Sequence, residues 1–196
     1  MPSATGPDSR EKDASILLYS ALYFFCVLAS YYIFRPIRDQ AAVAGGVHNL
    51  PWLFTGTLAA MLLANPLFSA LVARYTRRRF IPLSYRFFIL NLIIFFYFFN
   101  YSDASSSIWA GRIFYIWTSV FNLFVVSIFW AFMADTFSSE EGKRVFGLIA
   151  VGGTLGGIFG SGITASLSEI LGPVYLLLIS ALLLECGLFC FNRILR

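Results

Sequence analysis

Three charged side chains follow one another closely at the end of the first long apolar segment. Arg35, Arg38 and Asp39 have spacings of three and four residues, which bring side chains onto one face if the helix continues past Pro36. An arginine fork suits a phosphate or a carboxylate, because it donates two parallel charge-assisted hydrogen bonds. The pattern predicts an anion-binding corner; the alternative is an interfacial Arg–Asp pair that only ends the helix.

Two further charges, Arg86 and Glu185, lie inside apolar segments. A charged group at membrane depth costs about 2.5–3.5 kcal/mol on insertion scales, so each needs a partner or a hydrated cavity. At 1.5 Å per residue, both lie roughly 9 Å from the boundary expected on the same side of the membrane. Their equal depth makes an ion pair the first hypothesis, and a coupling role such as proton carriage the alternative.

A mixed-sign segment between the fourth and fifth apolar segments faces the basic run at residues 77–79. A salt-bridge network between these two loops is one interpretation, because it would hold the protein in one conformation. The other is a solvated hairpin whose ion pairs contribute less than about 1 kcal/mol each. The residues of the segment are Asp135, Glu140, Glu141, Lys143 and Arg144.

Small residues recur at spacings of four in the fifth apolar segment, at Gly152, Gly156 and Gly160. In lipid, such spacing lets two helices approach closely and gain van der Waals contact. We expect this face to pack against the second span or a partner half. A phosphate-binding loop is not indicated, because no strand precedes the glycines and no Lys–Ser/Thr pair follows them.

The sequence indicates no catalytic set, metal site or cofactor site. His48 is the only histidine and has no nucleophile or carboxylate partner in a recognisable arrangement. Cys26, Cys186 and Cys190 lie inside apolar segments and are interpreted as packing residues. We therefore expect a protein that is not an enzyme.

The elements that carry these residues are expected to be membrane spans. Of the 196 residues, 59% are hydrophobic and only 12% are charged, and the mean hydropathy is +0.77. A helix needs about 20 apolar residues to cross the hydrocarbon core, and runs of this length recur. We predict an all-α bundle of six spans over 16–191, at 16–34, 52–73, 80–100, 108–133, 145–168 and 174–191, between a disordered tail at 1–15 and a short end at 192–196.

Loop charge predicts the orientation of these spans. Lys and Arg accumulate on the cytoplasmic side of membrane proteins, so we expect a multi-pass protein of the inner membrane with both termini in the cytoplasm. The basic run at 74–79 is interpreted as an anchor to anionic lipid and not as a nucleic-acid patch. The residues expected inside are Arg10, Lys12, Arg74, Arg77, Arg78, Arg79, Lys143, Arg144, Arg193 and Arg196, ten of the fourteen basic residues.

Two sets of residues resemble known families. Residues 69–79 resemble the loop between spans two and three of the major facilitator superfamily, with Ser69, Ala73 and Thr76 at its usual Gly, Asp and Gly positions. Residues 34–40 (FRPIRDQ), 45–46 (GG) and 50–54 (LPWLF) resemble the first span and following loop of the bacterial and plastid ATP/ADP translocase family. Residues 129–130 (FW), 141–144 (EGKR) and 146–147 (FG) are similar to the same family at matching spacing.

The resemblance implies one six-span half of a twelve-span nucleotide exchanger, with two halves around a central cavity. It implies that Arg38 matches a basic residue of the transport path, and that spans three and six are neighbours, so that Arg86 and Glu185 would form a buried pair. Asn122 becomes a candidate substrate ligand, because span four lines the cavity in such folds. An acidic position expected in the fourth span falls near Thr118 instead.

The leading hypothesis is a transporter half that moves an anionic solute such as ATP or ADP by alternating access. Its expected partners are lipid, the solute, and a second six-span half or another copy of the chain; the chain is then either a fragment or a half that dimerises. The alternatives are a facilitator with a non-nucleotide substrate and a non-transporting membrane protein that acts as an assembly partner.

Overall fold

The fold is a bundle of six long α-helices. It is known from a computed structural model, which describes residues 7–44, 46–101 and 103–195. No strand occurs in this described part of the chain. Short turns join the helices, and two of them contain 3-10 helices, η1 (Val47–Asn49) and η2 (Pro173–Tyr175). The helices are α1 (Pro7–Ala44), α2 (Leu50–Arg74), α3 (Arg77–Tyr101), α4 (Ala104–Thr136), α5 (Ser139–Leu171) and α6 (Leu176–Ile194).

All six helices are long and apolar enough to cross a membrane, which confirms the predicted all-α six-span architecture. Five of them extend beyond the expected spans at both ends, because hydrogen bonding within a helix continues past the point where apolar residues give way to charged ones. Residues 7–15 of the expected tail belong to α1, and residues 192–194 of the expected end belong to α6. Residues 1–6 and Arg196 lie outside the described residues.

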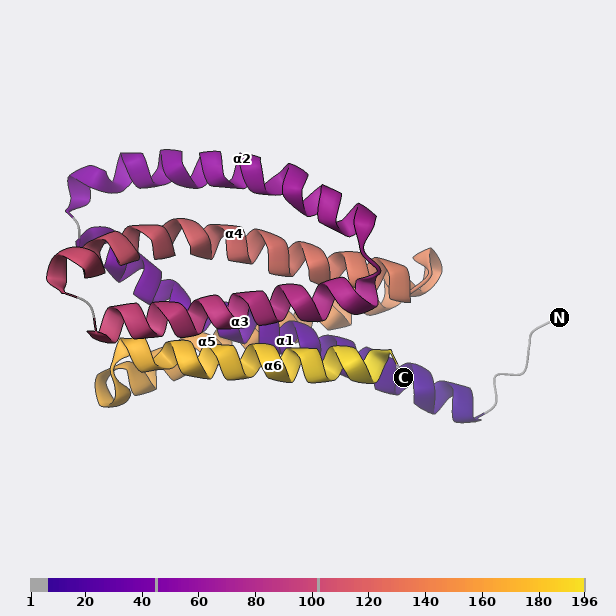
Figure 1. Cartoon of the computed structure of the whole chain (residues 1–196). Coiled ribbons are helices and arrows are strands. Elements are labelled where there is room, and N and C mark those ends of the chain that lie inside the picture. The colour runs from indigo at the N-terminus through magenta and orange to yellow at the C-terminus, as the bar shows by residue number, and fades with distance from the viewer. Residues whose placement is uncertain (1–6, 45, 102, 196) are drawn as a thin grey trace.

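Helix α1 lies at the centre of the bundle (Figure 1). The ring of its fully buried Tyr23 contacts rings from three other helices. The centroid distances are 5.7 Å to Tyr85 of α3, 5.0 Å to Phe129 of α4 and 6.3 Å to Phe191 of α6. Aromatic side chains with large apolar area therefore hold the centre of the molecule together.

The glycines of α5 lie against the backbone of α1. A Cβ atom added to Gly156 would lie 2.3 Å from the carbonyl oxygen of Phe25, so only glycine permits this approach. These glycines were expected to pack closely against span two or a partner half. The close packing is present, but the expected neighbour is wrong, because the helix that contacts this face is α1. The equivalent contacts are Gly152 with the carbonyl oxygen of Ala21 at 2.6 Å and Gly160 with that of Ala29 at 2.4 Å.

Hydroxyl groups add polar links between α1 and its two closest neighbours. The Ser30 hydroxyl donates to the Ser180 carbonyl at 3.0 Å, and the Ser180 hydroxyl donates to the Ser30 carbonyl at 3.2 Å. The Thr164 hydroxyl donates to the Ile33 carbonyl at 3.0 Å. These bonds fix the register of α1 against α6 and α5 at the level where Pro36 interrupts the hydrogen bonding of α1.

Helix α2 lies at the edge of the bundle and packs mainly against α4. Only 6% of its most apolar stretch is buried, compared with 44% for α1. Its contact with the bundle includes Phe68, whose ring lies 5.0 Å from that of Phe124 in α4. The apolar residues on its other sides are exposed, so lipid or another protein must cover them.

Candidate functional site

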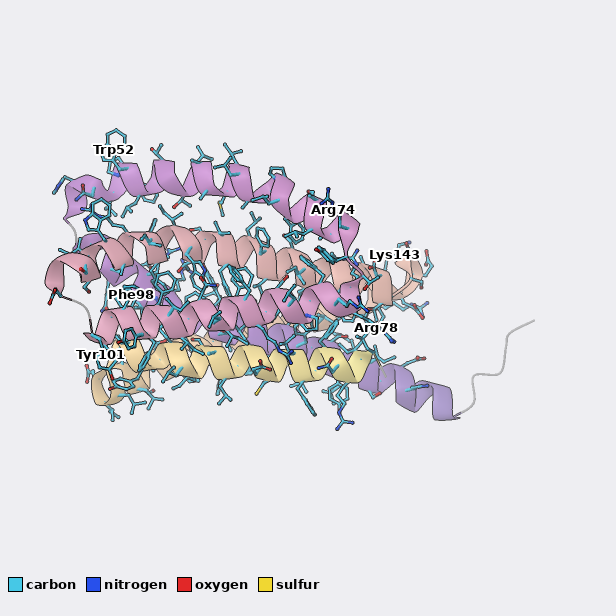
Figure 2. The ribbon with its side chains drawn as sticks, viewed as in Figure 1. Trp52, Arg74, Arg78, Phe98, Tyr101 and Lys143 are labelled. Atoms are coloured by element: carbon cyan, nitrogen blue, oxygen red, sulfur yellow. The ribbon has the colours of Figure 1, made fainter. Side chains whose placement is uncertain are left out.

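The two ends of the bundle differ in charge. Arg74, Arg78 and Lys143 lie at one end, close to the C-terminus, whereas Trp52 and Tyr101 lie at the other (Figure 2). We call these the basic end and the far end. The positive-inside rule places basic loops in the cytoplasm. The orientation with both termini in the cytoplasm stays a prediction.

A groove runs along the contact between α1 and α5 toward the far end. Its deeper part has a volume of about 500 Å³ and is lined by residues such as Leu28, Thr154 and Gly157. Its wider part has a volume of about 670 Å³. Tyr32 and Ser161 line both parts, so the two form one continuous cleft. The remaining lining residues of the wider part are Arg35, Pro36, Asp39, Gln40 and Val43.

Arg35 places a positive charge on the wall of the groove. Its guanidinium carbon lies 5.6 Å from the centre of the Tyr32 ring, one helical turn earlier. Among the described residues, no carboxylate lies within ion-pair distance of Arg35, so its five donors are open to a ligand. Helix α1 positions this group. The anion-binding corner was predicted on the condition that the helix continues past Pro36, and α1 does so.

Arg38 points away from the groove. Its guanidinium donates two hydrogen bonds to one carboxylate oxygen of Asp39, from Nε at 2.9 Å and from Nη2 at 2.7 Å. Its carbon lies 5.0 Å from the centre of the Tyr115 ring in α4, and its side chain is only 17% exposed. The predicted corner is therefore divided: Arg35 and Asp39 line the groove, and the fork of Arg38 is occupied by Asp39.

The two candidate positions in α4 lie apart from the groove. Asn122 is half-buried and is not among the residues that line the cleft. Thr118 is buried, and its hydroxyl donates to the Phe114 carbonyl at 2.8 Å. The role of Asn122 as a substrate ligand stays a prediction.

Arg86 and Glu185 are neighbours, but they are not buried. The distance between Arg86 Nε and Glu185 Oε1 is 3.9 Å, so spans three and six are adjacent as expected. The side chains are 69% and 48% exposed, respectively. The expectation of a buried pair is wrong, because both residues lie on the outward faces of α3 and α6.

At the basic end, one ion pair among the described residues joins the two loops that were expected to form a network. Arg77 at the start of α3 pairs with Asp135 near the end of α4. Lys143 instead pairs with Glu140 of its own loop at 2.9 Å, and Arg144 is exposed. The pairing between the loops is thus narrower than the predicted network.

Glu141 caps the N-terminus of α5. The Ser138 amide donates to its carboxylate at 2.9 Å, and the Ser138 hydroxyl accepts from the Glu141 amide at 3.4 Å, which completes a capping box. The role of Glu141 here is to begin a helix.

Sequence reasoning missed most of the residues that line the groove, among them the polar residues Tyr32, Gln40 and Ser161. Tyr32 precedes Arg35 by three residues, a spacing that places both on one helical face. Ser161 lies in the same glycine-rich run as Gly160. Their spacing along α1 and α5 was a usable signal once those helices were known to be adjacent.

In the described part of the chain, six helices long and apolar enough to cross a membrane define a multi-pass membrane protein. The chain belongs to the Major Facilitator Superfamily, whose sequence profile matches residues 15–194. Members of this superfamily are membrane transporters and not enzymes. No curated protein and no solved structure matches the chain.

Proposed function

We propose that this chain is one half of a facilitator that moves an anionic solute, such as ATP or ADP, by alternating access across the inner membrane. The observation that carries the proposal is Arg35, a cation without a carboxylate partner among the described residues, in a groove between two spanning helices. A charge at such a position is retained where a hydrated path or a ligand compensates it.

The groove offers complementary chemistry for a nucleotide. The Arg35 fork suits phosphate oxygens in a bidentate geometry. The Tyr32 ring, which is half-buried beside it, presents an apolar surface on which a base can stack. The hydroxyl of Ser161 on α5 supplies a further donor on the facing wall. The proposal of a nucleotide as the solute also rests on the resemblance of residues 34–40 and 141–144 to the ATP/ADP translocases.

Arg38 enters the proposal as a second, latent cation. Its carboxylate partner, Asp39, lines the groove and is 54% exposed. A bound phosphate group would attract Arg38 and repel Asp39, so the Arg38–Asp39 pair can open as the solute arrives.

Alternating access requires a second bundle opposite the groove, either another chain or another copy of this one. The basic end would then close on one side of the membrane. We assign this closure to the Arg77–Asp135 pair, because it joins the start of α3 to the end of α4 and must break if those ends separate. Glu141, Lys143 and Arg144 lie at the same end of the molecule, and we propose that they take part in this closure.

Uptake of labelled ATP into ADP-loaded proteoliposomes tests the proposal. We expect Arg35→Gln to reduce uptake by at least about tenfold, since one lost charge-assisted contact of about 1.5–3 kcal/mol has an effect of that order. Arg112→Gln is the matched control: this arginine also lies toward the far end, but it stacks on Trp109 at 4.6 Å and does not line the groove.

Equal uptake by the wild type and Arg35→Gln would contradict the role of the groove. Competition separates the substrates: excess unlabelled ADP should suppress the uptake, whereas suppression by inorganic phosphate or citrate alone would favour a facilitator with a non-nucleotide anion. No uptake, by the chain alone or with a second half, would favour the non-transporting alternative.

A further inference from the structure

One face of the bundle carries two charges among exposed apolar side chains, and a third, Arg193, lies over the Phe189 ring at 5.0 Å toward the basic end. We call it the α3–α6 face; Figure 1 shows α3 and α6 side by side, in front of α1 and α5. Arg86 and Glu185 lie in it with side-chain exposures of 69% and 48%. Large apolar side chains with exposures of more than half surround them: Leu83 and Leu90 on α3, and Leu182 and Phe189 on α6.

The depth of the pair follows from the length of α6. The apolar span that contains this helix, Pro173–Ile194, has 22 residues, close to the roughly 20 that are needed to cross the hydrocarbon. The span ends at Ile194 and not at the expected residue 191, so Glu185 lies roughly 13 Å from that end instead of the expected 9 Å. Such a span has little freedom to shift, so its midpoint lies near the middle of the bilayer. Glu185 is next to that midpoint, and Arg86 is held at the same depth by its proximity to Glu185.

The two charges satisfy each other only in part. The Nε–Oε1 distance of 3.9 Å exceeds hydrogen-bonding distance. Among the described residues, no hydrogen-bond acceptor contacts the Arg86 donors. Lipid tails cannot accept hydrogen bonds, and headgroups do not extend to the middle of the bilayer. A polar partner of matching depth is therefore needed.

We propose that the α3–α6 face binds a second copy of this chain about a two-fold axis along the membrane normal, with Arg86 of each copy against Glu185 of the other. Such an axis keeps every residue at its own depth. The face is self-complementary in charge, because each copy brings one cation and one anion to the same point. The apolar side chains around the pair complete the contact by close packing.

This inference goes beyond the transport proposal and is independent of it, because the groove belongs to α1 and α5. A copy bound at the α3–α6 face leaves the groove unchanged. Loss of this contact should therefore leave the binding of solute intact, and loss of Arg35 should leave the contact intact.

Cross-linking through a native cysteine tests the contact in the full chain. Cys186 is exposed and follows Glu185, so in a background of Cys26→Ala and Cys190→Ala it reports on this face alone. Oxidation to a disulfide by copper phenanthroline, a catalyst that enters lipid and uses dissolved oxygen as the oxidant, should link two copies in proteoliposomes. We expect Arg86→Glu alone, or Glu185→Arg alone, to lower the linked fraction by about tenfold or more, because like charges then meet.

Mixing the two single variants gives the decisive arm. With tags of different size, Arg86→Glu chains and Glu185→Arg chains should form a mixed linked dimer at about the wild-type level, since both cross-contacts are then opposite in sign. A wild type that gives no linked dimer, singles that link as well as the wild type, or a mixture that stays unlinked would each overturn the proposal.

Two uncharged variants test the same contact in case the charge variants misfold. Leu182→Trp should reduce cross-linking by steric overlap, because Leu182 lies on the α3–α6 face. Leu62→Trp on α2 should not, although both leucines are equally exposed at 65%. An equal effect of the two substitutions would also contradict the proposal.

Discussion

Helices α5 and α2 are both long, apolar and peripheral, yet they join the bundle in different ways. Helix α5 presents glycines whose backbone touches that of α1, and α2 presents leucines that touch almost nothing. The share of buried residues is 28% in the most apolar stretch of α5 and 6% in that of α2. Hydropathy identified both as spans, but only residue size distinguishes the packed helix from the exposed one.

The difference has a physical cause that is specific to lipid. Burying a leucine against another helix gains little when lipid tails cover it equally well, so close packing of small residues has to hold two helices together. The α1–α5 contact should therefore tolerate almost no added volume, whereas α2 should tolerate removal of volume. Substitutions in the two regions can sharpen or break this contrast.

The largest effect is expected from Gly156→Ala. The new Cβ would lie 2.3 Å from the Phe25 carbonyl oxygen, and backbone cannot move aside as a flexible side chain can. We expect a loss of about 3 kcal/mol or more of unfolding free energy, at the upper end of overpacking costs. Unfolding in mixed detergent micelles, followed by tryptophan fluorescence, measures it.

Gly162→Ala is the matched control for that substitution. It lies in the same helix, with nothing within 4 Å of the added Cβ, so replacing glycine by the better helix former should be neutral or slightly stabilising. If the two variants unfolded alike, close packing between α1 and α5 would not be the source of stability.

A smaller effect is expected from Ser180→Ala. This change removes the hydroxyl that donates to the Ser30 carbonyl across the α1–α6 contact. Hydrogen bonds between spans contribute about 0.6–1.7 kcal/mol, so we expect a loss of that size in the same unfolding assay. Thr154→Ala removes a hydroxyl that bonds only within its own helix, to Ala150, and should have less effect.

The smallest effect is expected on α2. Leu62 is 65% exposed, so Leu62→Ala should change the unfolding free energy by less than about 0.5 kcal/mol. Leu184 on α6 is fully buried, and Leu184→Ala should cost about 1 kcal/mol or more, because the cavity that it leaves loses van der Waals contacts even where lipid replaces water. A large loss for Leu62→Ala in the isolated chain would show that α2 is packed more tightly than its exposure indicates.

The sequence was sufficient for the number, order and type of the helices, because six apolar runs of spanning length leave few alternatives. It was not sufficient for their ends. Residues 35–44 continue α1 beyond the apolar run, since neither Pro36 nor the charges after it stop backbone hydrogen bonding. Hydropathy detects where lipid ends and does not detect where a helix ends.

The site was only partly predictable for a related reason. The spacing of Arg35 and Asp39 was enough to place them together, but the orientation of Arg38 depends on Tyr115 from α4. Equal depth was enough to pair Arg86 with Glu185, but their exposure depends on which side of α3 and α6 faces outward. Distances along one helix are encoded locally, and contacts between helices are not.

The central claim is that the α1–α5 groove belongs to a hydrated path. Its most direct test is labelling of Ser161→Cys by a charged, membrane-impermeant thiol reagent, in an otherwise cysteine-free full chain in proteoliposomes. Leu62→Cys, at the midpoint of α2, is the lipid-facing control. The account predicts that position 161 is labelled rapidly and position 62 is not labelled. It also predicts that ATP slows the labelling of position 161, and that this protection disappears when Arg35 is replaced. If neither position were labelled, the account would be contradicted.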